Sequence, residues 1–179
     1  MLTLNGTGEI IPFLANSFFK SEKTNFMEND MLLVGLNCLK KHTNYQYALL
    51  SCVSGLDFLY SKQRFGLVYE LVSLKFSNRV RLKIYVNEIT PVNSIMTVFK
   101  NADWWEREIW DLYGIYFRGH KDLRRILTDY GFEGFPMRKN YPLSGFVELR
   151  YDQNKKRIVV EALELAQDFR TFAFANPWK

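Results

Sequence analysis

Side chains able to carry acid–base chemistry are concentrated in residues 103–113. This segment contains Glu106, Glu108 and Asp111, and His120 follows nine positions after the last of them. Carboxylates and histidines are the usual general acids and bases of enzymes. One interpretation is therefore a stand-alone enzyme that uses Glu106, Glu108 and His120 for proton transfer.

Helical geometry favours a structural interpretation of the same segment. Glu106 and Glu108 are two positions apart, so they point away from each other on a helix. Arg107 lies one turn from both Asp103 and Asp111, and we expect ion pairs between these side chains. The apolar stripe that should pack on a sheet consists of Trp105, Ile109, Leu112 and Tyr113. This pattern is typical of a salt-bridged amphipathic helix.

Histidines and cysteines are too few for a familiar metal or cofactor site. Apart from His120 there is one other histidine, His42. Cys38 and Cys52 stand fourteen positions apart, so neither a zinc knuckle nor a disulfide framework can be built. The sequence also lacks P-loop, GxGxxG and GxSxG motifs. We therefore expect no metal, flavin or nucleotide on this chain, and a hydrogen-bonded structural role for His120.

The charge of the chain gives weak support to nucleic-acid binding. A formal charge of +5 results from 24 basic and 19 acidic residues, which are interspersed along the sequence. The residues that could form a folded basic patch are Arg79, Arg81, Lys83, Arg124, Arg125, Arg138 and Lys139, with Tyr85 and Tyr130 as stacking platforms. Because Asp122, Asp129 and Glu133 accompany the arginines, we expect a solvated face and no nucleic-acid partner.

The elements that position these residues begin with a helix and a group of strands. Leucines at helical spacing predict a helix over Asp30 to Lys41. Gln46 to Val53 is typical of a buried strand and Ser54 to Ser61 of a loop. A hairpin is predicted between Arg64 to Phe76 and Arg79 to Val86, because apolar residues alternate strictly with the other residues in the second segment. We expect its first strand to lie centrally, covered on both faces, and its second to present one basic face.

The charged helix sits between irregular segments. A helical turn through Ser94 to Phe99 precedes the helix, which Gly114 ends, and Tyr116 to Leu127 predicts a strand or loop followed by a helical turn. Asp129 to Pro136 contains too many helix and strand breakers for regular structure and predicts a shaped loop.

A second hairpin and an aromatic tail complete the chain. The hairpin pairs Phe146 to Tyr151 with Arg157 to Glu161. The tail has too few neighbours to bury its large aromatic side chains locally, so it either folds back on the body or lies across another subunit. These aromatic residues are Phe169, Phe172, Phe174 and Trp178.

Together these elements predict an α+β fold: a two-layer structure with a mixed β-sheet covered by helices and an extended, loop-rich C-terminal tail. With 179 residues, 47% of them hydrophobic, a single globular body is expected. We expect residues 1–127 to form this body. Residues 128–179 should form the shaped loop, the hairpin and a C-terminal extension for partner contacts, without being an independent domain.

No segment predicts membrane insertion or import. Apolar stretches such as Ile109 to Phe117 end well before the roughly 20 residues needed to span a bilayer. The first thirty residues carry four acidic residues and no arginine, unlike an import presequence. Synthesis inside an organelle, residence in a bacterium or prior removal of a leader all remain open.

The spacing of the charged residues resembles the 30-kilodalton subunit family of respiratory complex I, whose members are also called subunit 9. The segment Glu106-Arg107-Glu108, then Asp111, His120 and Arg124-Arg125-Ile126-Leu127 matches the signature of that family. The likeness covers roughly Tyr45 to Trp178 and includes Leu71 to Pro91, Leu127 to Gly134, Pro142 to Gly145, Glu148 to Asp152, Lys156 to Val159 and Pro177-Trp178. The family usually has His, Asp and Pro at the positions of Phe135, Asn140 and Ala162, which leaves open whether the loop is anchored to its own body or to a neighbour.

The resemblance implies a non-catalytic subunit of the peripheral, hydrophilic arm of proton-pumping NADH:ubiquinone oxidoreductase. It implies that the chain lies against the 49-kilodalton subunit near the quinone-reducing module, while flavin and iron–sulfur clusters reside in neighbouring subunits. An organelle-encoded subunit on the matrix face of the mitochondrial inner membrane is expected, with a bacterial cytoplasmic-face version as the alternative. Residues expected to hold the loop and the partner surface in register, without electron transfer, are Glu106, Arg107, Glu108, Asp111, Gly114, His120, Arg124, Arg125, Asp129, Gly131, Gly134, Arg150 and Trp178.

Overall fold

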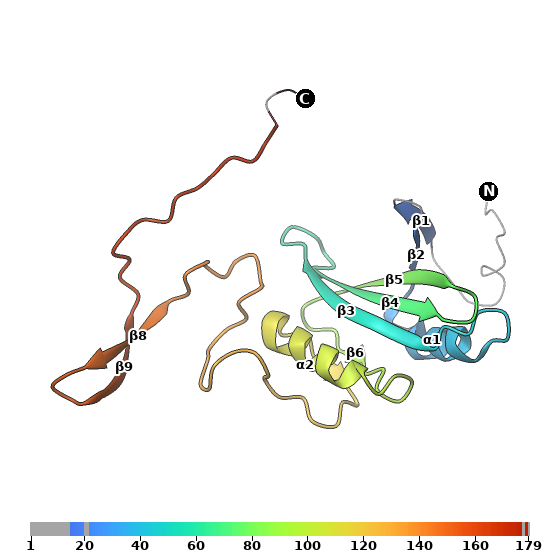
Figure 1. The fold of residues 1–179 in the computed structure, drawn as a ribbon, viewed down its shortest axis with the longest axis horizontal. Coiled ribbons are helices and arrows are strands. Elements are labelled where there is room, and N and C mark those ends of the chain that lie inside the picture. Colours follow the sequence, from blue (N-terminus) through green and yellow to red (C-terminus); the bar gives the residue numbers. More distant parts are fainter. Residues whose placement is uncertain (1–14, 20–21, 177, 179) are drawn as a thin grey trace. The chain divides into compact units, whose positions relative to one another are not determined.

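A computed structural model describes residues 15–19, 22–176 and 178 (Figure 1). Pro177 and much of the N-terminal segment discussed above lie outside these residues. The chain divides into two compact units, Met1–Tyr141 and Pro142–Lys179. The segment 128–141, which we grouped with the C-terminal extension, belongs to the first unit, where Thr128 and Lys139 are hydrogen-bonded to Asp111 and Asp57.

A five-stranded mixed sheet forms the framework of the first unit. Its order is β1-β2-β5-β4-β3, with β2 and β5 parallel and the other neighbours antiparallel. The strands are β1 (Ala15–Phe19), β2 (Glu22–Phe26), β3 (Leu49–Asp57), β4 (Phe65–Ser73) and β5 (Asn78–Val86). Strands β1 and β2 were not predicted, because apolar and polar residues do not clearly alternate in them. Strand β2 joins the sheet through its pairing with β5.

The predicted β4–β5 hairpin is confirmed, with Phe65 opposite Val86 and Ser73 opposite Asn78. One face of this hairpin is wholly buried and carries Leu67, Tyr69, Leu71, Leu82 and Ile84. The opposite face of β4, with Val68 and Glu70, is only half-buried. The expectation that β4 is covered on both faces is therefore wrong for this chain: the helices cover one face of the sheet.

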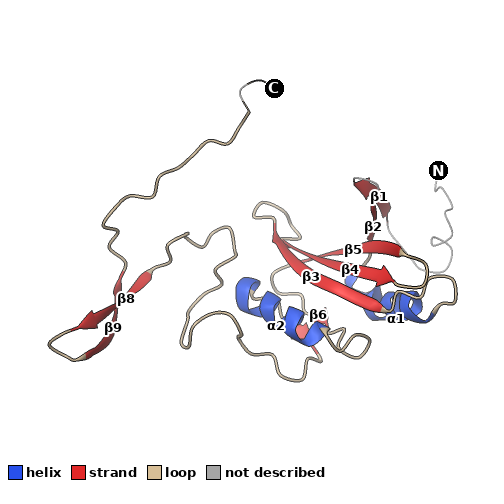
Figure 2. Cartoon of the chain, in the orientation of Figure 1, coloured by secondary structure: helices blue, strands red, loops and turns tan. Residues whose placement is uncertain are grey.

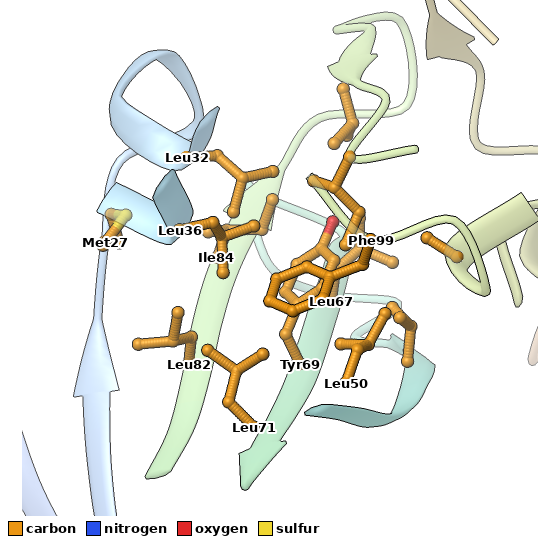
Figure 3. Close-up of a cluster of buried hydrophobic side chains, with 14 of the residues drawn as sticks. Met27, Leu32, Leu36, Leu50, Leu67, Tyr69, Leu71, Leu82, Ile84 and Phe99 are labelled. Atoms are coloured by element: carbon orange, nitrogen blue, oxygen red, sulfur yellow. The ribbon is translucent and has the colours of Figure 1, made fainter. Parts of the chain in front are cut away.

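Two helices cover that buried face and give the predicted two-layer α+β architecture (Figure 2). A short 3₁₀ turn, η1 (Asn29–Met31), leads into α1 (Leu32–Lys41), which confirms the helix predicted there. Leu32 and Leu36 of α1 face Ile84 and the neighbouring strand residues (Figure 3). The second helix, α2 (Ala102–Tyr113), adds Ala102 and Ile109 to the same core.

The apolar stripe of α2 is only partly as predicted. Ile109 is buried, and Trp105 and Tyr113 pack half-buried against the core, but Leu112 is not part of that cluster. The fully buried polar positions of α2 are two carboxylates, Glu106 and Asp111. A hydropathy stripe cannot reveal them, because their burial depends on partners from distant segments.

Strand β3 corrects the predicted boundary between strand and loop. It covers Leu49–Asp57, so the strand expected over Gln46 to Val53 begins later and continues into the segment expected to be a loop. Gly55 explains the error: its missing side chain leaves room for the Tyr113 ring, whose Cε2 atom would lie 2.6 Å from an added Cβ. In a strand, glycine often marks such a close approach.

Two short strands flank α2 in the sequence and pair with each other in parallel. The first, β6 (Val92–Asn93), precedes the helix and pairs with β7 (Phe117–Arg118), which follows it. The turn expected through Ser94 to Phe99 is present, with the amides of Val98 and Phe99 bonded to the Ile95 carbonyl. After β7 the chain runs as an irregular loop, without the helical turn expected before Leu127.

The second unit contains the predicted C-terminal hairpin, formed by β8 (Val147–Asp152) and β9 (Arg157–Ala162). Cross-strand pairs Leu149–Val160 and Tyr151–Ile158 share one face, and all four side chains are exposed. The tail aromatics Phe169, Phe172, Phe174 and Trp178 are exposed as well. Over the described part of the chain, no helix has the length and apolar character needed to cross a membrane.

Candidate functional site

Asp111 is a wholly buried carboxylate that ties α2 to the loop after β7. Its Oδ2 atom accepts hydrogen bonds from the amides of Ile126, Leu127 and Thr128 at 3.2, 2.7 and 2.9 Å. Its Oδ1 atom accepts from the Thr128 hydroxyl at 2.6 Å and from Arg125 Nη1 at 3.0 Å. One side chain thus fixes four consecutive loop residues.

These donors decide the charge of Asp111. Burial by itself would raise its pKa, but the bonds from the Thr128 hydroxyl and from the three amides outweigh burial and lower the pKa to about 2. Asp111 is therefore a carboxylate at neutral pH, and its charge is balanced by the loop and Arg125.

Arg107 holds the same loop from the other side of its backbone. Its Nε and Nη2 atoms donate to the carbonyls of Arg124 and Arg125 at 3.3 and 3.5 Å, and its guanidinium lies 5.5 Å from the Trp104 ring centroid. The expected ion pairs of Arg107 with Asp103 and Asp111 are wrong. The loop folds back over α2 and offers backbone partners to both Arg107 and Asp111, which displace the intrahelical pairs suggested by the spacing.

Arg125 links the start of the loop to its later part. Besides Asp111 it binds the Gly134 carbonyl, with an Nη2 to oxygen distance of 2.9 Å. Its guanidinium lies 5.8 and 5.2 Å from the ring centroids of Phe132 and Phe135. The loop is therefore folded around this arginine, and Arg125 is not available as part of a free basic patch.

A second buried cluster surrounds Glu106. Its carboxylate accepts hydrogen bonds from the Ser94 hydroxyl at 2.6 Å and from the Ile95 amide at 2.7 Å. His120 Nε2 lies 3.7 Å from Glu106 Oε2 and 3.1 Å from Asp103 Oδ1. This cluster joins the segment before α2, the helix itself and the loop after β7.

Burial dominates the protonation of Glu106. It raises the pKa of Glu106 to about 7; the bonds from Ser94 and Ile95 oppose this effect, and the nearby Asp103 adds to it. Tyr69 is buried beside this cluster, and burial together with Glu106 raises the pKa of its hydroxyl well above the ordinary value.

His120 is hydrogen-bonded, as predicted from the sequence. The Asp122 amide donates to His120 Nδ1 at 3.1 Å, and Nε2 faces Asp103 Oδ1 at 3.1 Å. The imidazole side chain has no solvent exposure. His120 therefore orients the turn at residues 120–122 against α2.

A further anchor, missed from the sequence, holds the end of the loop. Asp57, with a fully buried side chain, accepts from Arg64 Nε at 2.8 Å and from the Lys139 amide at 2.7 Å. Burial acts to raise the pKa of Asp57, but the bonds from Arg64 and Lys139 prevail and lower it. Arg138 pairs with Glu88 and donates through Nε to the Tyr113 carbonyl at 2.7 Å. The sequence signal that could have revealed the Asp57 anchor is its opposite charge to Arg64, seven positions later, at the other end of the connection between β3 and β4.

The two departures from the family pattern in this loop contact the chain's own body. Phe135 packs edge-on against Trp110, with ring centroids 5.9 Å apart. It also lies against Gly114, which ends α2 with a φ of 75°; an added Cβ there would be 2.6 Å from the Phe135 ring. Asn140 Oδ1 accepts a hydrogen bond from Arg64 at 2.8 Å.

The remaining predicted site residues are more scattered. Glu108 is half-buried beside an apolar pocket, while Arg124 is exposed and paired with Asp122 at 3.0 Å. In the loop, Asp129 accepts from the Tyr130 amide, and Gly131 and Gly134 have positive φ angles. In the second unit, Arg150 pairs with Glu161 and Trp178 is exposed.

This geometry gives the acid–base interpretation no support. Glu106 and His120 are wholly buried as side chains, and Glu108 lies apart beside the pocket. Four members of the suggested basic patch are paired with carboxylates: Arg81, Arg124, Arg125 and Arg138. Within the described residues, no three His, Cys, Asp or Glu side chains are grouped to hold a metal ion. In the part of the chain that the structure describes, the contacts of this site position a loop.

Comparisons with known proteins agree with this structural interpretation. Residues 27–147 match the family described as respiratory-chain NADH dehydrogenase, 30 Kd subunit. Among the relatives, NADH-ubiquinone oxidoreductase subunit 9 of Reclinomonas americana is 50% identical over 162 residues, which cover 90% of this chain and 79% of that protein. NADH dehydrogenase [ubiquinone] iron-sulfur protein 3 of Beta trigyna is 49% identical, over 89% of this chain and 84% of that protein.

A solved structure shares the fold at low sequence identity. It is a chain from the membrane-bound sulfane sulfur reductase, described as an archaeal respiratory membrane complex, with a TM-score of 0.66 and 18% identity over 86% of this chain and 95% of that chain. The family match and the high identity to the curated relatives carry the assignment. This chain belongs to the 30-kilodalton subunit family of respiratory-chain NADH dehydrogenase, complex I.

Proposed function

We propose that this chain is a non-catalytic structural subunit of the peripheral arm of proton-pumping NADH:ubiquinone oxidoreductase, where it holds the quinone-reducing module together. The observation that carries the proposal is the use of Asp111: this wholly buried carboxylate directs its hydrogen bonds to loop residues 125–128. A carboxylate that accepts hydrogen bonds from four loop residues holds the loop in place and is not free to act on a reactant.

The proposed partners are the 49-kilodalton subunit and the neighbouring iron–sulfur subunits of the quinone module. Membership of a complex I subunit family supports assembly with other subunits of that complex. The exposed apolar face of the β8–β9 hairpin supports extensive partner contacts, because an isolated two-stranded hairpin is at best marginally stable in water.

We further propose that the chain carries no cofactor and that flavin and iron–sulfur clusters reside in its neighbours. Iron–sulfur clusters are usually held by about four cysteines. This sequence has two, Cys38 on α1 and Cys52 on β3, and both are free. Stoichiometric iron on the purified chain would contradict this part of the proposal.

The proposed location is the matrix face of the mitochondrial inner membrane, with an organelle gene as the source. The relatives NADH-ubiquinone oxidoreductase subunit 9 of Reclinomonas americana and NADH dehydrogenase [ubiquinone] iron-sulfur protein 3 of Beta vulgaris, both from eukaryotes, support a mitochondrial site. The alternative is the cytoplasmic face of a bacterial membrane, and finding the gene in organelle or bacterial DNA distinguishes the two.

Replacing Arg107 tests the structural role. In a strain whose only copy carries Arg107→Ala, native gels should show complex I reduced or replaced by smaller subassemblies, because the loop loses its backbone anchor. The matched control is Arg79→Ala, an exposed arginine of β5, which should leave the amount of complex unchanged. A normal amount of complex in the Arg107→Ala strain would contradict the proposed role.

A further inference from the structure

The outer side of α2 carries a shallow apolar pocket that the anchoring network does not use. It has a volume of about 340 Å³ and is lined by Trp104, Trp105, Glu108, Ile126 and Leu127. We propose that this pocket receives an apolar side chain from another subunit, carried on a segment that also places a lysine or arginine beside Glu108. The inference rests on the proposed function and names the chemistry of one partner contact.

Asp111 and Arg107 position the walls of this pocket. Asp111 binds the amides of Ile126 and Leu127, which brings the two apolar side chains next to α2. Arg107 binds the carbonyls just before them and lies over one face of the Trp104 ring. The pocket walls are therefore fixed from two sides before a partner arrives.

Preformed walls matter for affinity. A pocket that is already ordered in the free chain avoids the entropy loss of arranging its side chains during binding. The network around Asp111 and Arg107 therefore serves recognition as well as folding.

The exposure of the walls indicates a protein partner. Trp104 is 65% exposed and Leu127 is 61% exposed, although both are large apolar side chains. Small-molecule sites bury about 70–90% of their ligand, which a pocket with two such open walls does not achieve. Tryptophan in a pocket that becomes desolvated is, by contrast, a frequent energetic centre of protein interfaces.

Charge selects the partner segment. Glu108 is the one charged residue among the five that line the pocket. Within the described residues, no ion pair is formed by its carboxylate, whereas Glu106 and Asp111 on the same helix are engaged in bonds. A basic side chain beside the apolar anchor would compensate Glu108 as water is displaced, since a desolvated unpaired charge is costly.

Photo-crosslinking tests the occupant. The chain with p-benzoylphenylalanine at position 127 is incorporated into the complex in vivo, the complex is irradiated, and crosslinked peptides are sequenced. The matched control carries the same group at Leu74, an exposed leucine of the β4–β5 turn that is 71% exposed. We expect a crosslink from 127 to another subunit, in a segment with an apolar residue within about one helical turn of a lysine or arginine.

Three outcomes would overturn the inference. These are a crosslink to a second copy of this chain, a crosslink to a segment without a basic residue, and a yield at 127 no higher than at 74. The unsubstituted chain provides the separate test of the proposed function: if it is absent from the complex I band on native gels, the proposed function itself has failed.

Substitutions measure the contribution of the pocket. Leu127→Asp should lower the fraction of chain in the complex by about tenfold, and Glu108→Lys by several-fold, because each removes a complementary feature. Leu74→Asp is the control and should have no effect. Urea unfolding of each purified chain must give the unsubstituted midpoint; a folded Leu127→Asp chain that assembles normally would refute the pocket while leaving the proposed function intact.

Discussion

At the scale of single residues, Glu106 and Asp111 show how the surroundings of a buried carboxylate decide its charge. Both are wholly buried on α2. Asp111 faces three amides, a hydroxyl and Arg125, whereas Glu106 has two donors and lies near Asp103. The pKa of the first is accordingly lowered to about 2 and that of the second raised to about 7. The two pKa values move in opposite directions because burial, supported by the nearby Asp103, prevails at Glu106, whereas the larger set of donors prevails at Asp111.

Asp111→Asn should destabilise the purified chain by about 3 kcal/mol, because an amide group cannot accept all the hydrogen bonds offered to the carboxylate. Urea unfolding at neutral pH measures the loss. The folded pKa of Asp111 lies below its ordinary value, so its contribution is present above about pH 3.8 and is lost as pH falls through about 2. The control Asp122→Asn, at an exposed pair, should change stability by less than about 0.5 kcal/mol. A loss no greater than that of the control would show that the Asp111 network is not stabilising.

Glu106→Gln should remove a pH dependence from the unfolding free energy. The folded pKa of Glu106 lies above its ordinary value, so the folded chain holds a proton that the unfolded chain has released. This contribution is complete below about pH 4.5 and is lost as pH rises through about 7. From about pH 5 to pH 7.5 the unsubstituted chain should therefore lose roughly 2 kcal/mol relative to Glu106→Gln.

Urea titrations across that pH range measure the difference between the two curves. Leu74→Ala, an exposed and non-titrating change, is the control and should run parallel to the unsubstituted chain. Parallel curves for Glu106→Gln and the unsubstituted chain would mean that Glu106 is ionised in the folded state at all these pH values.

At the scale of elements, the contact between α2 and β3 depends on Gly55. The Tyr113 ring occupies the space where a side chain at position 55 would lie, with Cε2 and Cδ2 at 2.6 and 2.7 Å from the added Cβ. Gly55→Ala should cost about 1–3 kcal/mol, because the helix or the ring must shift. Urea unfolding checks this, and a Tyr113→Ala background provides the control. If alanine at 55 costs as much there as in the unsubstituted chain, the ring is not the cause.

The elements that could be predicted from the sequence are those whose signals are local. The alternation of apolar residues in Arg79 to Val86 predicts one face of a strand, which is present as β5. The leucine spacing in Asp30 to Lys41 predicts one face of a helix, which is present as α1. The C-terminal hairpin was predicted for the same reason. The prediction ended strand β3 too early, because glycine usually interrupts a strand. In the fold, Gly55 lies within β3 and leaves room for the ring of Tyr113, 58 positions later.

Only part of the candidate site was predicted from the sequence, and its contacts were not. Glu106, Arg107, Asp111, His120 and Arg125 do gather around α2. Several of their partners are backbone groups 9 to 18 positions away, and no helical spacing rule describes such contacts. The Asp57 anchor was missed for the same reason, since the Lys139 amide is 82 positions distant.

At the scale of the whole molecule, the two units differ in how much they bury. The first has a continuous core that includes both helices and the central strands. The second exposes apolar residues along one hairpin face and a tail with Phe174 and Trp178 each more than 90% exposed. The second unit is therefore suited to be covered by other subunits, consistent with the proposed structural function.

Limited proteolysis should reveal this difference. Trypsin should cut the isolated chain first at Lys155, Lys156 or Arg157, in the turn and strand end of the C-terminal hairpin, because little packing protects that backbone. In the assembled complex, cleavage there should be slower by at least about tenfold. Mass spectrometry identifies the sites, and Lys62, in the exposed loop between β3 and β4, serves as an internal reference. Equal rates at the hairpin in both states would contradict coverage of the second unit by partners.

The central claim is that this chain supplies structure to NADH:ubiquinone oxidoreductase and no reacting group. The most direct test is the rate of NADH:ubiquinone oxidoreduction per assembled complex in strains carrying Glu106→Gln or His120→Ala. We predict that in both variants the rate per complex remains that of the unsubstituted strain, and that His120→Ala, which removes a buried hydrogen-bonded side chain, lowers the amount of complex. A normal amount of complex with its turnover abolished would contradict the claim and return Glu106 and His120 to a catalytic role.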